Sequence, residues 1–564
     1  MAAPSPKELR EVLGPSPGPR AEWWWGGPCQ RGTSQPYGVT ASADKADGIA
    51  WKVDFGELLC NQSNPVLVSS EGRYVWSSAP CIIVGHSDGR LSVTSSEGSQ
   101  PPAPGDVAVG EGHGNLRGAF RAAAKAHFPA SGYTPDPVLI KAPQYNLWIE
   151  CHYWPTQAAV LLYAKQVLEH GMPAGVIMID TNWALHYGSF EFNKTRFPDP
   201  RAMAEELHEL GFKLMVWITP FISPDSTTFR YAEAKGYLLK NPMGMASVTR
   251  WWDGYSALLD PLNPRAVEWF EEGLEGLRVL GVDGFKMDGG DPEYYAQVTR
   301  ESVGESLKYT EAFAAMGLKY KLAEYRACWK QAGTHLCQRL CDKNHAWGTG
   351  GLAALIPNGV AQGLAGYAFG CPDMIGGGQY ADFYQIGTLE ARCDIDQELF
   401  VRFAQVSALF PMMQFSLAPW RVLDKGHLAA CVDAANLHAK LGDYLWGLAE
   451  EAAHSGEPIL RCMEYVFPQQ GFEAVRHQFM LGDDVLVAPV ATKLVHAGGG
   501  DDGSGNQRQH VVTVPAGDWA GQGCAAGMTV SGPVELSVPL PEGGPGGAAL
   551  PQLLWFKRVP LPGP

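Results

Sequence analysis

Residues 264–291 read PRAVEWFEEGLEGLRVLGVDGFKMDGGD, and they contain a helix-like segment followed by a short strand. The first part is amphipathic and opens with a proline, which is typical of a helix N-terminus. The second part changes to the apolar run GFKM, which ends at Asp288. A helix that leads into a short apolar strand is the repeating unit of a parallel sheet.

The same alternation continues through residues 136–455, where eight apolar runs are candidate strands. They are Leu147–Cys151, Val176–Asp180, Lys213–Ile218, Gly284–Asp288, Leu322–Arg326, Cys337–Asp342, Tyr367–Asp373 and Met412–Ser416. Helix-like segments separate most of them. Eight such units in roughly 300 residues predict an α/β fold, a (β/α)8 TIM barrel, rather than an open doubly wound sheet.

Five of these runs end at a charged residue, namely Asp180, Asp288, Arg326, Asp342 and Asp373. One charged strand end would be unremarkable, because strands commonly stop at a solvated residue. The carboxyl ends of barrel strands meet at one face, however, and barrel enzymes carry their active sites there. We therefore expect the five side chains to share a site.

The segments on either side of the barrel have a different texture. Residues 1–135 combine short β-branched and aromatic runs with Gly, Ser and Pro, and predict an N-terminal β-sandwich-like domain with a linker. The Ser-, Pro- and Gly-rich stretch at 95–114 is predicted to be that linker or a long loop. Residues 456–564 predict a C-terminal β domain, with a flexible loop at HAGGGDDGSGN, residues 496–506.

Composition excludes several classes of protein. Of the 564 residues, 46% are hydrophobic and 18% charged, as in packed globular proteins. A formal net charge of −16 would repel phosphate backbones, so no nucleic-acid partner is expected. The sequence as given has neither a membrane-span-length apolar run nor a signal-peptide core, which leaves the compartment unknown. Without zinc-ligand or EF-hand spacing, no metal or cofactor is expected, and the oligomeric state stays open.

The strand end at Asp288 carries a second charged residue. Side chains of a strand alternate between its faces, so Lys286 and Asp288 point to the same side. A buried lysine beside a carboxylate favours the ionised carboxylate, which a nucleophilic aspartate needs. The pair could equally be a structural ion pair that closes the barrel.

Asp342 ends the sixth run, two units from Asp288, so the two carboxylates can face each other across a pocket. Paired carboxylates suit glycosidic cleavage: one attacks the anomeric carbon, and the other protonates the departing oxygen and then activates water. The proton donor needs a raised pKa, to which the like charge of Asp288 would contribute. In isolation, Asp342 could instead be a helix N-cap.

Tryptophans follow or precede several of these acids, at Trp183, Trp217, Trp251, Trp252 and Trp347. Flat rings bind the apolar faces of sugars and leave the hydroxyl groups to Asp and Arg. Each tryptophan taken alone could be a core residue. Their coincidence with the acids favours a sugar site.

Several motifs together resemble glycoside hydrolase family 31, the retaining α-glycosidases that include α-glucosidases, α-xylosidases and sulfoquinovosidases. Within that family the sequence is most similar to the branch of the myogenesis-regulating glycosidase, whose relatives include α-galactosidases. The motifs are WWWGG at 23–27, VIMIDTNW at 176–183, WWDG at 251–254, FKMDGGD at 285–291, CDKNHAWG at 341–348 and PDMIGGG at 372–378.

The resemblance implies a role for each matching residue. It makes Asp288 the nucleophile and Asp342 the acid/base, with no metal or cofactor. The residues it implies for substrate binding are Asp180, Arg326, Asp373, Trp25, Trp251 and Trp252. To these we add Lys286 and Trp183 from the strand and aromatic patterns above.

Two departures from the family pattern concern the substrate. The glucosidase members carry Arg-x-His after the eighth strand, where this chain has Ser416-Leu417-Ala418-Pro419-Trp420, and Asp291 stands where relatives usually have Glu. We predict a retaining, exo-acting α-glycosidase, with α-galactosides slightly favoured over α-glucosides as substrates. The alternatives are an inactive carbohydrate-binding or quality-control homologue, or a transglycosylase or lyase that uses the same covalent intermediate.

Overall fold

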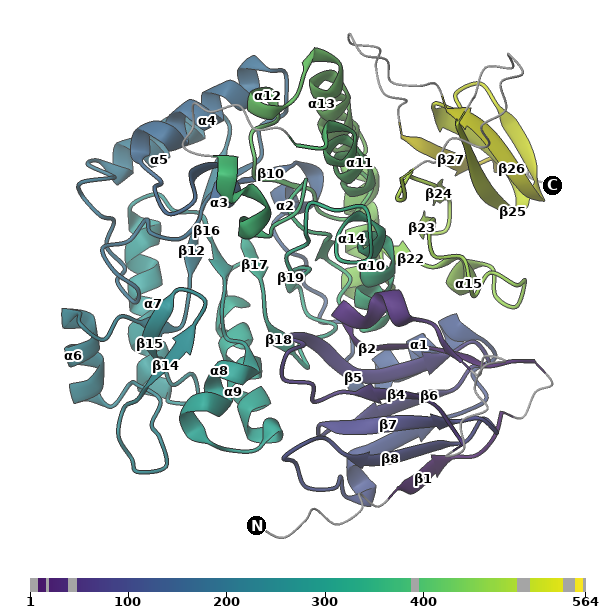
Figure 1. Cartoon of the computed structure of the whole chain (residues 1–564), viewed down its shortest axis with the longest axis horizontal. Coiled ribbons are helices and arrows are strands. Elements are labelled where there is room, and N and C mark those ends of the chain that lie inside the picture. The colour runs from purple at the N-terminus through teal and green to yellow at the C-terminus, as the bar shows by residue number, and fades with distance from the viewer. Residues whose placement is uncertain are drawn as a thin grey trace.

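A central barrel is flanked by N-terminal sheets on one side and a C-terminal sheet on another in the computed structural model (Figure 1). The structure describes residues 9–16, 20–38, 48–386, 395–493, 508–540 and 553–560. The predicted flexible loop at residues 496–506 lies outside these ranges. None of the helices in the described ranges is long and apolar enough to cross a membrane.

Eight parallel strands form the barrel, in the order β20-β19-β17-β16-β12-β11-β10-β21. They are β10 (Gln144–Asn146), β11 (Val176–Ile179), β12 (Lys213–Ile218), β16 (Gly284–Met287), β17 (Ala323–Tyr325), β19 (Cys337–Arg339), β20 (Gly370–Cys371) and β21 (Gln414–Phe415). A bridge between Met374 and Gln414 joins the two ends of the sheet. The predicted TIM barrel is confirmed.

The prediction of the first strand is wrong. Residues Trp148–Cys151 form a short helix, α3, and the strand β10 lies just before it. The side chain of Asn146 accepts a hydrogen bond from the backbone N–H of Trp148 at 3.0 Å, which turns the chain into the helix. A short buried apolar run does not distinguish a strand from a helical turn, so the pattern alone could not place this boundary.

Helices alternate with the strands around the barrel. The main ones are α2 (Pro137–Lys141), α4 (Gln157–Glu169), α5 (Pro200–Glu209), α7 (Pro264–Val279), α8 (Pro292–Thr299), α9 (Val303–Gly317), α10 (Leu355–Leu364), α11 (Gln397–Ser407), α12 (Pro419–Val422), α13 (Lys425–Lys440) and α14 (Gly442–Ser455). Asn263 caps α7 by accepting a hydrogen bond from the backbone N–H of Arg265 at 3.1 Å. Phe270, Leu274 and Leu277 bury the inner face of α7.

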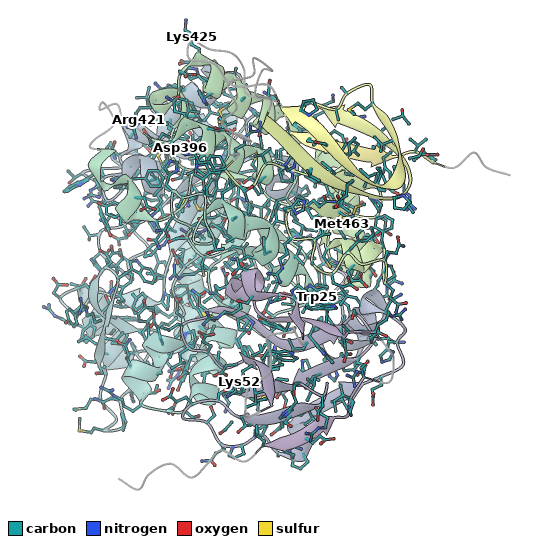
Figure 2. All side chains as sticks on the ribbon, turned by 45° about the vertical axis from the view of Figure 1, so that its right-hand side comes forward. Trp25, Lys52, Asp396, Arg421, Lys425 and Met463 are labelled. Carbon is teal, nitrogen blue, oxygen red and sulfur yellow. The ribbon has the colours of Figure 1, made fainter. Side chains whose placement is uncertain are left out.

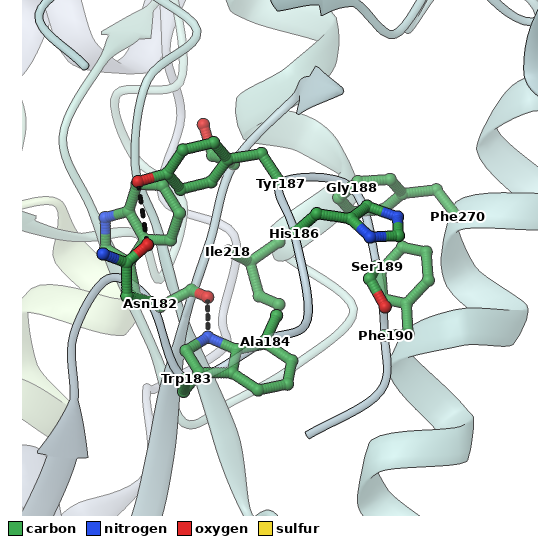
Figure 3. A pocket seen from close by; sticks show the side chains of 12 residues that line it. Asn182, Trp183, Ala184, His186, Tyr187, Gly188, Ser189, Phe190, Ile218 and Phe270 are labelled. Atoms are coloured by element: carbon green, nitrogen blue, oxygen red, sulfur yellow. Dashed lines mark hydrogen bonds between the residues drawn. The ribbon is translucent and has the colours of Figure 1, made fainter. Parts of the chain in front are cut away.

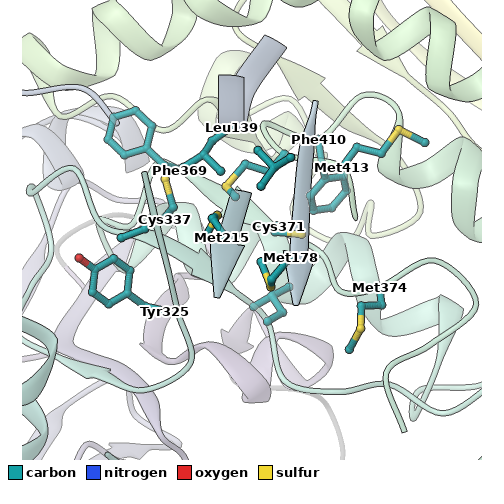
Figure 4. Packing of buried hydrophobic residues seen from close by; sticks show 14 of the residues in the cluster. Leu139, Met178, Met215, Tyr325, Cys337, Phe369, Cys371, Met374, Phe410 and Met413 are labelled. Atoms are coloured by element: carbon teal, nitrogen blue, oxygen red, sulfur yellow. The ribbon is translucent and has the colours of Figure 1, made fainter. Parts of the chain in front are cut away.

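The register of the parallel strands places inward-facing residues of neighbouring strands side by side inside the barrel. Met178 pairs with Met215 across β11 and β12, and both are fully buried (Figure 4). Two residues further along, Trp217 pairs with Lys286, and Lys286 pairs with Glu324 on β17. Because side chains alternate along a strand, these residues and Asp288 point into the barrel in successive rows.

Two antiparallel sheets make up the N-terminal part. One contains β1 (Arg10–Leu13), β8 (Leu91–Ser95), β7 (Cys81–His86) and β4 (Ile49–Asp54); the other contains β3 (Tyr37–Gly38), β2 (Trp23–Pro28), β5 (Gln62–Ser69), β6 (Tyr74–Ser77) and β9 (Val107–Gly110). The stretch predicted as a linker at 95–114 therefore includes a strand, since β9 pairs with β6. Helix α1 (Leu116–His127) follows it.

The N-terminal sheet is connected directly to the barrel. Strand β18 (Cys328–Trp329), which follows β17, pairs in parallel with β5, and Cys328 lies opposite Gln62. A three-stranded insertion after β12 contains β13 (Phe221–Ile222), β14 (Val248–Trp251) and β15 (Gly254–Leu258), with α6 (Thr227–Lys235). Both additions emerge from the carboxyl ends of barrel strands.

The C-terminal part is a six-stranded antiparallel sheet. Its order is β22 (Leu460–Arg461), β23 (Phe479–Leu481), β24 (Val485–Val487), β27 (Leu554–Arg558), β25 (Arg508–Gly523) and β26 (Thr529–Leu540), with α15 (Met463–Val466) beside it. Buried residues such as Val512, Trp519 and Phe556 form a separate cluster within it. It lies away from the carboxyl ends of the barrel strands that carry Asp180 and Asp288 (Figure 1).

Candidate active site

A cavity of about 350 Å³ opens at the carboxyl ends of the barrel strands. Six of the ten predicted site residues line it: Asp180, Trp252, Lys286, Asp288, Arg326 and Asp342. Trp217, one of the tryptophans considered for sugar stacking, also lines it. The remaining residues of its wall were not expected at the site, namely Trp148, Tyr153, Thr181, Asp253, Tyr294, Arg339, Met374, Gly378, Gln379 and Tyr380. The two carboxylates expected to face a sugar therefore share one hollow.

Asp288 lies at the bottom of this cavity and is 6% exposed. Its Oδ2 accepts from the indole N–H of Trp217 at 2.7 Å, and its Oδ1 accepts from the backbone N–H of Gly289 at 2.8 Å. The ammonium of Lys286 is 3.4 Å from Oδ2, and the guanidinium of Arg326 is 3.6 Å from Oδ1. Donors and cations thus surround both oxygens.

These neighbours decide the protonation state of Asp288. Burial opposes its ionisation, but the charges of Lys286, Arg326 and Arg339, together with the Trp217 hydrogen bond, outweigh burial and hold the pKa of Asp288 well below its usual range. Lys286 also donates to Asp180 Oδ2 at 2.8 Å, and these carboxylates raise the pKa of Lys286 against the effect of burial. The lowered pKa therefore favours the ionised form of Asp288, although its side chain is largely buried.

The pKa of Asp342 is lowered, whereas a raised pKa was expected for the proton donor. Burial opposes its ionisation, but Arg339 and Arg326 outweigh burial and lower the pKa of Asp342. The Nη1 of Arg339 donates to Asp342 Oδ1 at 2.7 Å, while the Asp342 side chain remains 27% exposed. Arg339 was not among the predicted site residues, so a cation beside this carboxylate was not expected.

Three predicted tryptophans do not line the cavity. Trp183 is buried behind β12, where its indole N–H donates to the carbonyl oxygen of Trp217 at 2.7 Å (Figure 3). The hollow beside it measures about 30 Å³, too small for a sugar. Trp25 lies where the N-terminal sheet meets the barrel helices (Figure 2), beside Ile356 and Val360 of α10.

Trp251 supports the cavity wall from behind. It is 4% exposed and stacks on Phe221 with ring centroids 4.0 Å apart. Its neighbour Trp252 is 43% exposed, faces the cavity and lies with its ring 4.7 Å from the Arg326 guanidinium. Trp251 is the last residue of β14 and Trp252 lies in the turn that leads to β15, so the two adjacent tryptophans become one core residue and one rim residue.

Asp373 is also outside the set of lining residues. It is 1% exposed, and Arg339 Nη1 donates to its Oδ1 at 2.7 Å. The expected contact of Asp373 with a sugar is therefore not present in the cavity wall.

The N-terminal sheet contributes residues that the sequence reasoning did not connect with the site. The side-chain amide of Asn61 donates to Asp291 Oδ1, and Asp291 binds Arg326 Nε through both carboxylate oxygens at 3.2 Å. Gln62 donates to the carbonyl oxygen of Arg326 at 2.8 Å. Asn61 is itself held by Gln30, which donates to Asn61 Oδ1 at 2.7 Å. This chain of contacts fixes Arg326 against the cavity.

We expect Asn61→Ala to lower kcat/KM on an aryl glycoside about tenfold. A buried hydrogen bond to a charged group contributes about 1.5 kcal/mol or more, and about 1.4 kcal/mol corresponds to tenfold. Asn64→Ala is the matched control, because Asn64 is equally buried on β5 and donates instead to the carbonyl oxygen of Ala365 at 2.8 Å. Equal losses in both variants would show that Asn61 contributes only stability, which thermal melting would record.

The family model for the TIM-barrel domain of glycosyl hydrolases family 31 matches residues 139–448, which hold all eight barrel strands and every residue named above as lining the cavity. The chain belongs to glycoside hydrolase family 31. The predicted membership of glycoside hydrolase family 31 is confirmed.

Individual relatives agree with the family assignment. The chain is 30% identical over 407 residues to the myogenesis-regulating glycosidase of Mus musculus, covering 70% of this chain and 54% of that protein. It is 27% identical over 394 residues to an alpha-xylosidase of Emericella nidulans, covering 63% of this chain and 46% of that protein. The chain thus spans about half the length of these two relatives.

A solved family 31 structure has the same fold. The dextranase of Flavobacterium johnsoniae complexed with glucose superimposes with a TM-score of 0.76 at 18% sequence identity, covering 99% of this chain and 67% of that one. The superposition therefore includes the N- and C-terminal sheets as well as the barrel.

Proposed function

We propose that this family 31 member is a retaining α-glycosidase that hydrolyses terminal α-linked sugars. The observation that supports this most strongly is an anionic Asp288 at the bottom of a cavity whose wall also contains Asp342. The cavity of about 350 Å³ falls within the range of small-ligand sites. Its position at the carboxyl ends of the strands is where barrel enzymes act.

The first step uses Asp288 as the nucleophile. One of its oxygens forms a bond to the anomeric carbon while the bond to the departing oxygen breaks, and Asp342 gives that oxygen a proton. The donors around Asp288 keep it ionised beforehand, so no proton has to leave the nucleophile during the reaction.

The second step uses Asp342 as a base. Once Asp288 is esterified, its negative charge is lost, which lowers the pKa of Asp342 further. Asp342 then takes a proton from water, which attacks the anomeric carbon and releases Asp288 with retention of configuration. Arg339 and Arg326 favour this ionised state, so the same cations that assist the second step oppose the first. Activity is expected to be lost on the alkaline side as Asp342 loses its proton.

The charges of the cavity favour a neutral sugar. The residues that line the cavity include four carboxylates, namely Asp180, Asp253, Asp288 and Asp342. They include only three cations, Lys286, Arg326 and Arg339. Each cation already has a carboxylate partner: Lys286 is 2.8 Å from Asp180, Arg326 is 3.2 Å from Asp291, and Arg339 is 2.7 Å from Asp342. Hydroxyl groups can donate to these carboxylates, whereas an anionic group would meet like charge.

We expect a C6 sulfonate or C6 carboxylate to lower kcat/KM about 1000-fold relative to the matching α-glucoside. Placing like charges together costs several kcal/mol, and about 4 kcal/mol corresponds to 1000-fold. The measurement compares aryl α-glucoside, α-sulfoquinovoside and α-glucuronide with the same leaving group. Comparable rates on the sulfonate would contradict the neutral-sugar proposal while leaving hydrolysis itself intact.

Adding the aryl α-galactoside to this panel separates galactosides from glucosides, which differ only at C4. The slight preference for α-galactosides rests on the departure at residues 416–420 and stays a prediction. Product analysis decides between hydrolysis and transglycosylation, because a sugar acceptor in place of water would give a new glycoside from the same covalent intermediate.

A further inference from the structure

Asp373 is a buried carboxylate that the proposed reaction does not use. One nitrogen of Arg339 joins it to Asp342: Nη1 donates to Asp342 Oδ1 and to Asp373 Oδ1, each at 2.7 Å. The Asp342 side chain is 27% exposed, whereas that of Asp373 is fully buried. A single guanidinium thus connects the carboxylate in the cavity to one behind it.

The second oxygen of Asp373 holds the backbone that follows Asp342. Asp373 Oδ2 accepts from the backbone N–H of Lys343 at 2.6 Å and from that of Gly378 at 3.0 Å. Lys343 is the residue directly after Asp342, so these bonds fix the point where the chain leaves Asp342. The same two segments meet again where the backbone N–H of Gln379 donates to the carbonyl oxygen of Lys343 at 3.0 Å.

The backbone is shaped to bring the two carboxylates together. Asp373 has φ = +135°, a conformation that residues with a side chain rarely adopt. A Cβ added at Gly378 would lie 2.8 Å from Asp373 Oδ1 and 2.9 Å from Asp342 Oδ1. The glycine therefore lets the chain pass closely beside both carboxylates, which any side chain would push apart.

We propose that Asp373 is a positioning residue that sets the orientation of the acid/base Asp342 through Arg339 and the backbone of Lys343. This proposal rests on the proposed function. It replaces the direct contact with the sugar that the family resemblance implied for Asp373.

The competing interpretation is that Asp373 only neutralises the buried Arg339 and contributes stability. Asp373→Asn separates the two, because asparagine keeps an oxygen for the N–H groups of Lys343 and Gly378 and removes the charge that faces Arg339. A counter-ion role predicts a lower melting temperature and the same fractional loss of activity on every substrate. A positioning role predicts a loss that depends on the leaving group.

We expect Asp373→Asn to lower kcat/KM about 100-fold on aryl glycosides with poor leaving groups, because general acid catalysis contributes at least this much. On dinitrophenyl glycosides, which need no proton, the loss should stay below about fivefold. Gly378→Ala, which keeps every charged group, should show the same dependence on the leaving group.

Asp382→Asn is the matched control. Asp382 Oδ2 accepts from the backbone N–H of His345 at 2.8 Å, so it holds the same loop three residues beyond Asp342 without touching Arg339. Asp382→Asn should lower kcat/KM by the same factor on all substrates, or leave it unchanged. If Asp373→Asn fails to fold, Gly378→Ala alone decides.

Two results would overturn the proposal. Without wild-type turnover on any aryl glycoside, the proposed function and the positioning role fall together. With wild-type turnover and a leaving-group-dependent loss in Asp342→Asn, a uniform loss or no loss in both Asp373→Asn and Gly378→Ala overturns the positioning role alone.

Discussion

Asp288→Ala is expected to lower kcat by about 10⁴-fold or more on an activated aryl glycoside, as removal of a catalytic nucleophile does in other enzymes. The carboxylate that would attack the anomeric carbon is gone, and Lys286, Trp217 and Arg326 then surround an empty position. The alanine variant leaves room for a small anion. Added azide should restore part of the turnover and yield a glycosyl azide of inverted configuration, because it attacks from the side of Asp288.

Asp283→Asn is the matched control for this variant. Asp283 precedes β16 at the opposite end of the barrel, where it binds Lys213 at 3.1 Å and the backbone N–H of Leu214 at 2.8 Å. It should keep wild-type turnover. Wild-type rates in Asp288→Ala would disprove the nucleophile assignment, and a wild-type protein that binds sugar without any turnover would favour the carbohydrate-binding alternative.

The barrel could be predicted because its signal is repeated. Seven of the eight predicted runs contain the observed strand, and Lys213–Ile218 has the predicted bounds. The error at residues 147–151 arose where a side chain, Asn146, ends the strand early. The strand β9 was hidden in a Gly- and Pro-rich stretch, because its pairing with β6 depends on a partner some thirty residues away.

Only the site residues at or near the ends of barrel strands could be predicted from the sequence. Asp180, Lys286 and Asp288 follow from alternation on their strands, and the structure brings them within hydrogen-bonding or ion-pairing distance. Arg339 follows the same rule, since it is inward-facing on β19. It was not predicted because it lies inside its run, and only the charged residue at the end of that run, Asp342, was assigned to the site. Asn61 could not be found this way, because its contact with Asp291 joins residues 230 positions apart.

Family motifs did not distinguish residues that line the cavity from residues that support it. Trp251 and Trp252 are adjacent in one motif, yet only Trp252 faces the cavity. Trp25, Trp183 and Asp373 belong to motifs of the same kind, but they are buried and do not line the cavity. A motif records which residues a site needs, and the packing decides whether each one touches the ligand.

Asp342→Asn is expected to divide substrates by their leaving groups. Glycosides with poor leaving groups need the proton from Asp342, so their kcat/KM should fall about 1000-fold, within the range of general acid catalysis. Dinitrophenyl glycosides leave without a proton, so their first step should be nearly unaffected. Breakdown of the covalent intermediate still needs the base, so these substrates should instead show a burst followed by slow turnover.

The pH profile gives an independent test of the same role. In the wild type, the alkaline limb should report the loss of the proton from Asp342, whose pKa Arg339 and Arg326 lower against the effect of burial. Asparagine does not titrate, so this limb should disappear in Asp342→Asn when a poor leaving group is used. If the limb persisted, or if all substrates lost activity equally, the proton donor would be another residue. Arg339 would then hold Asp342 as a permanent anion, and the cations of this cavity would serve only to bind it.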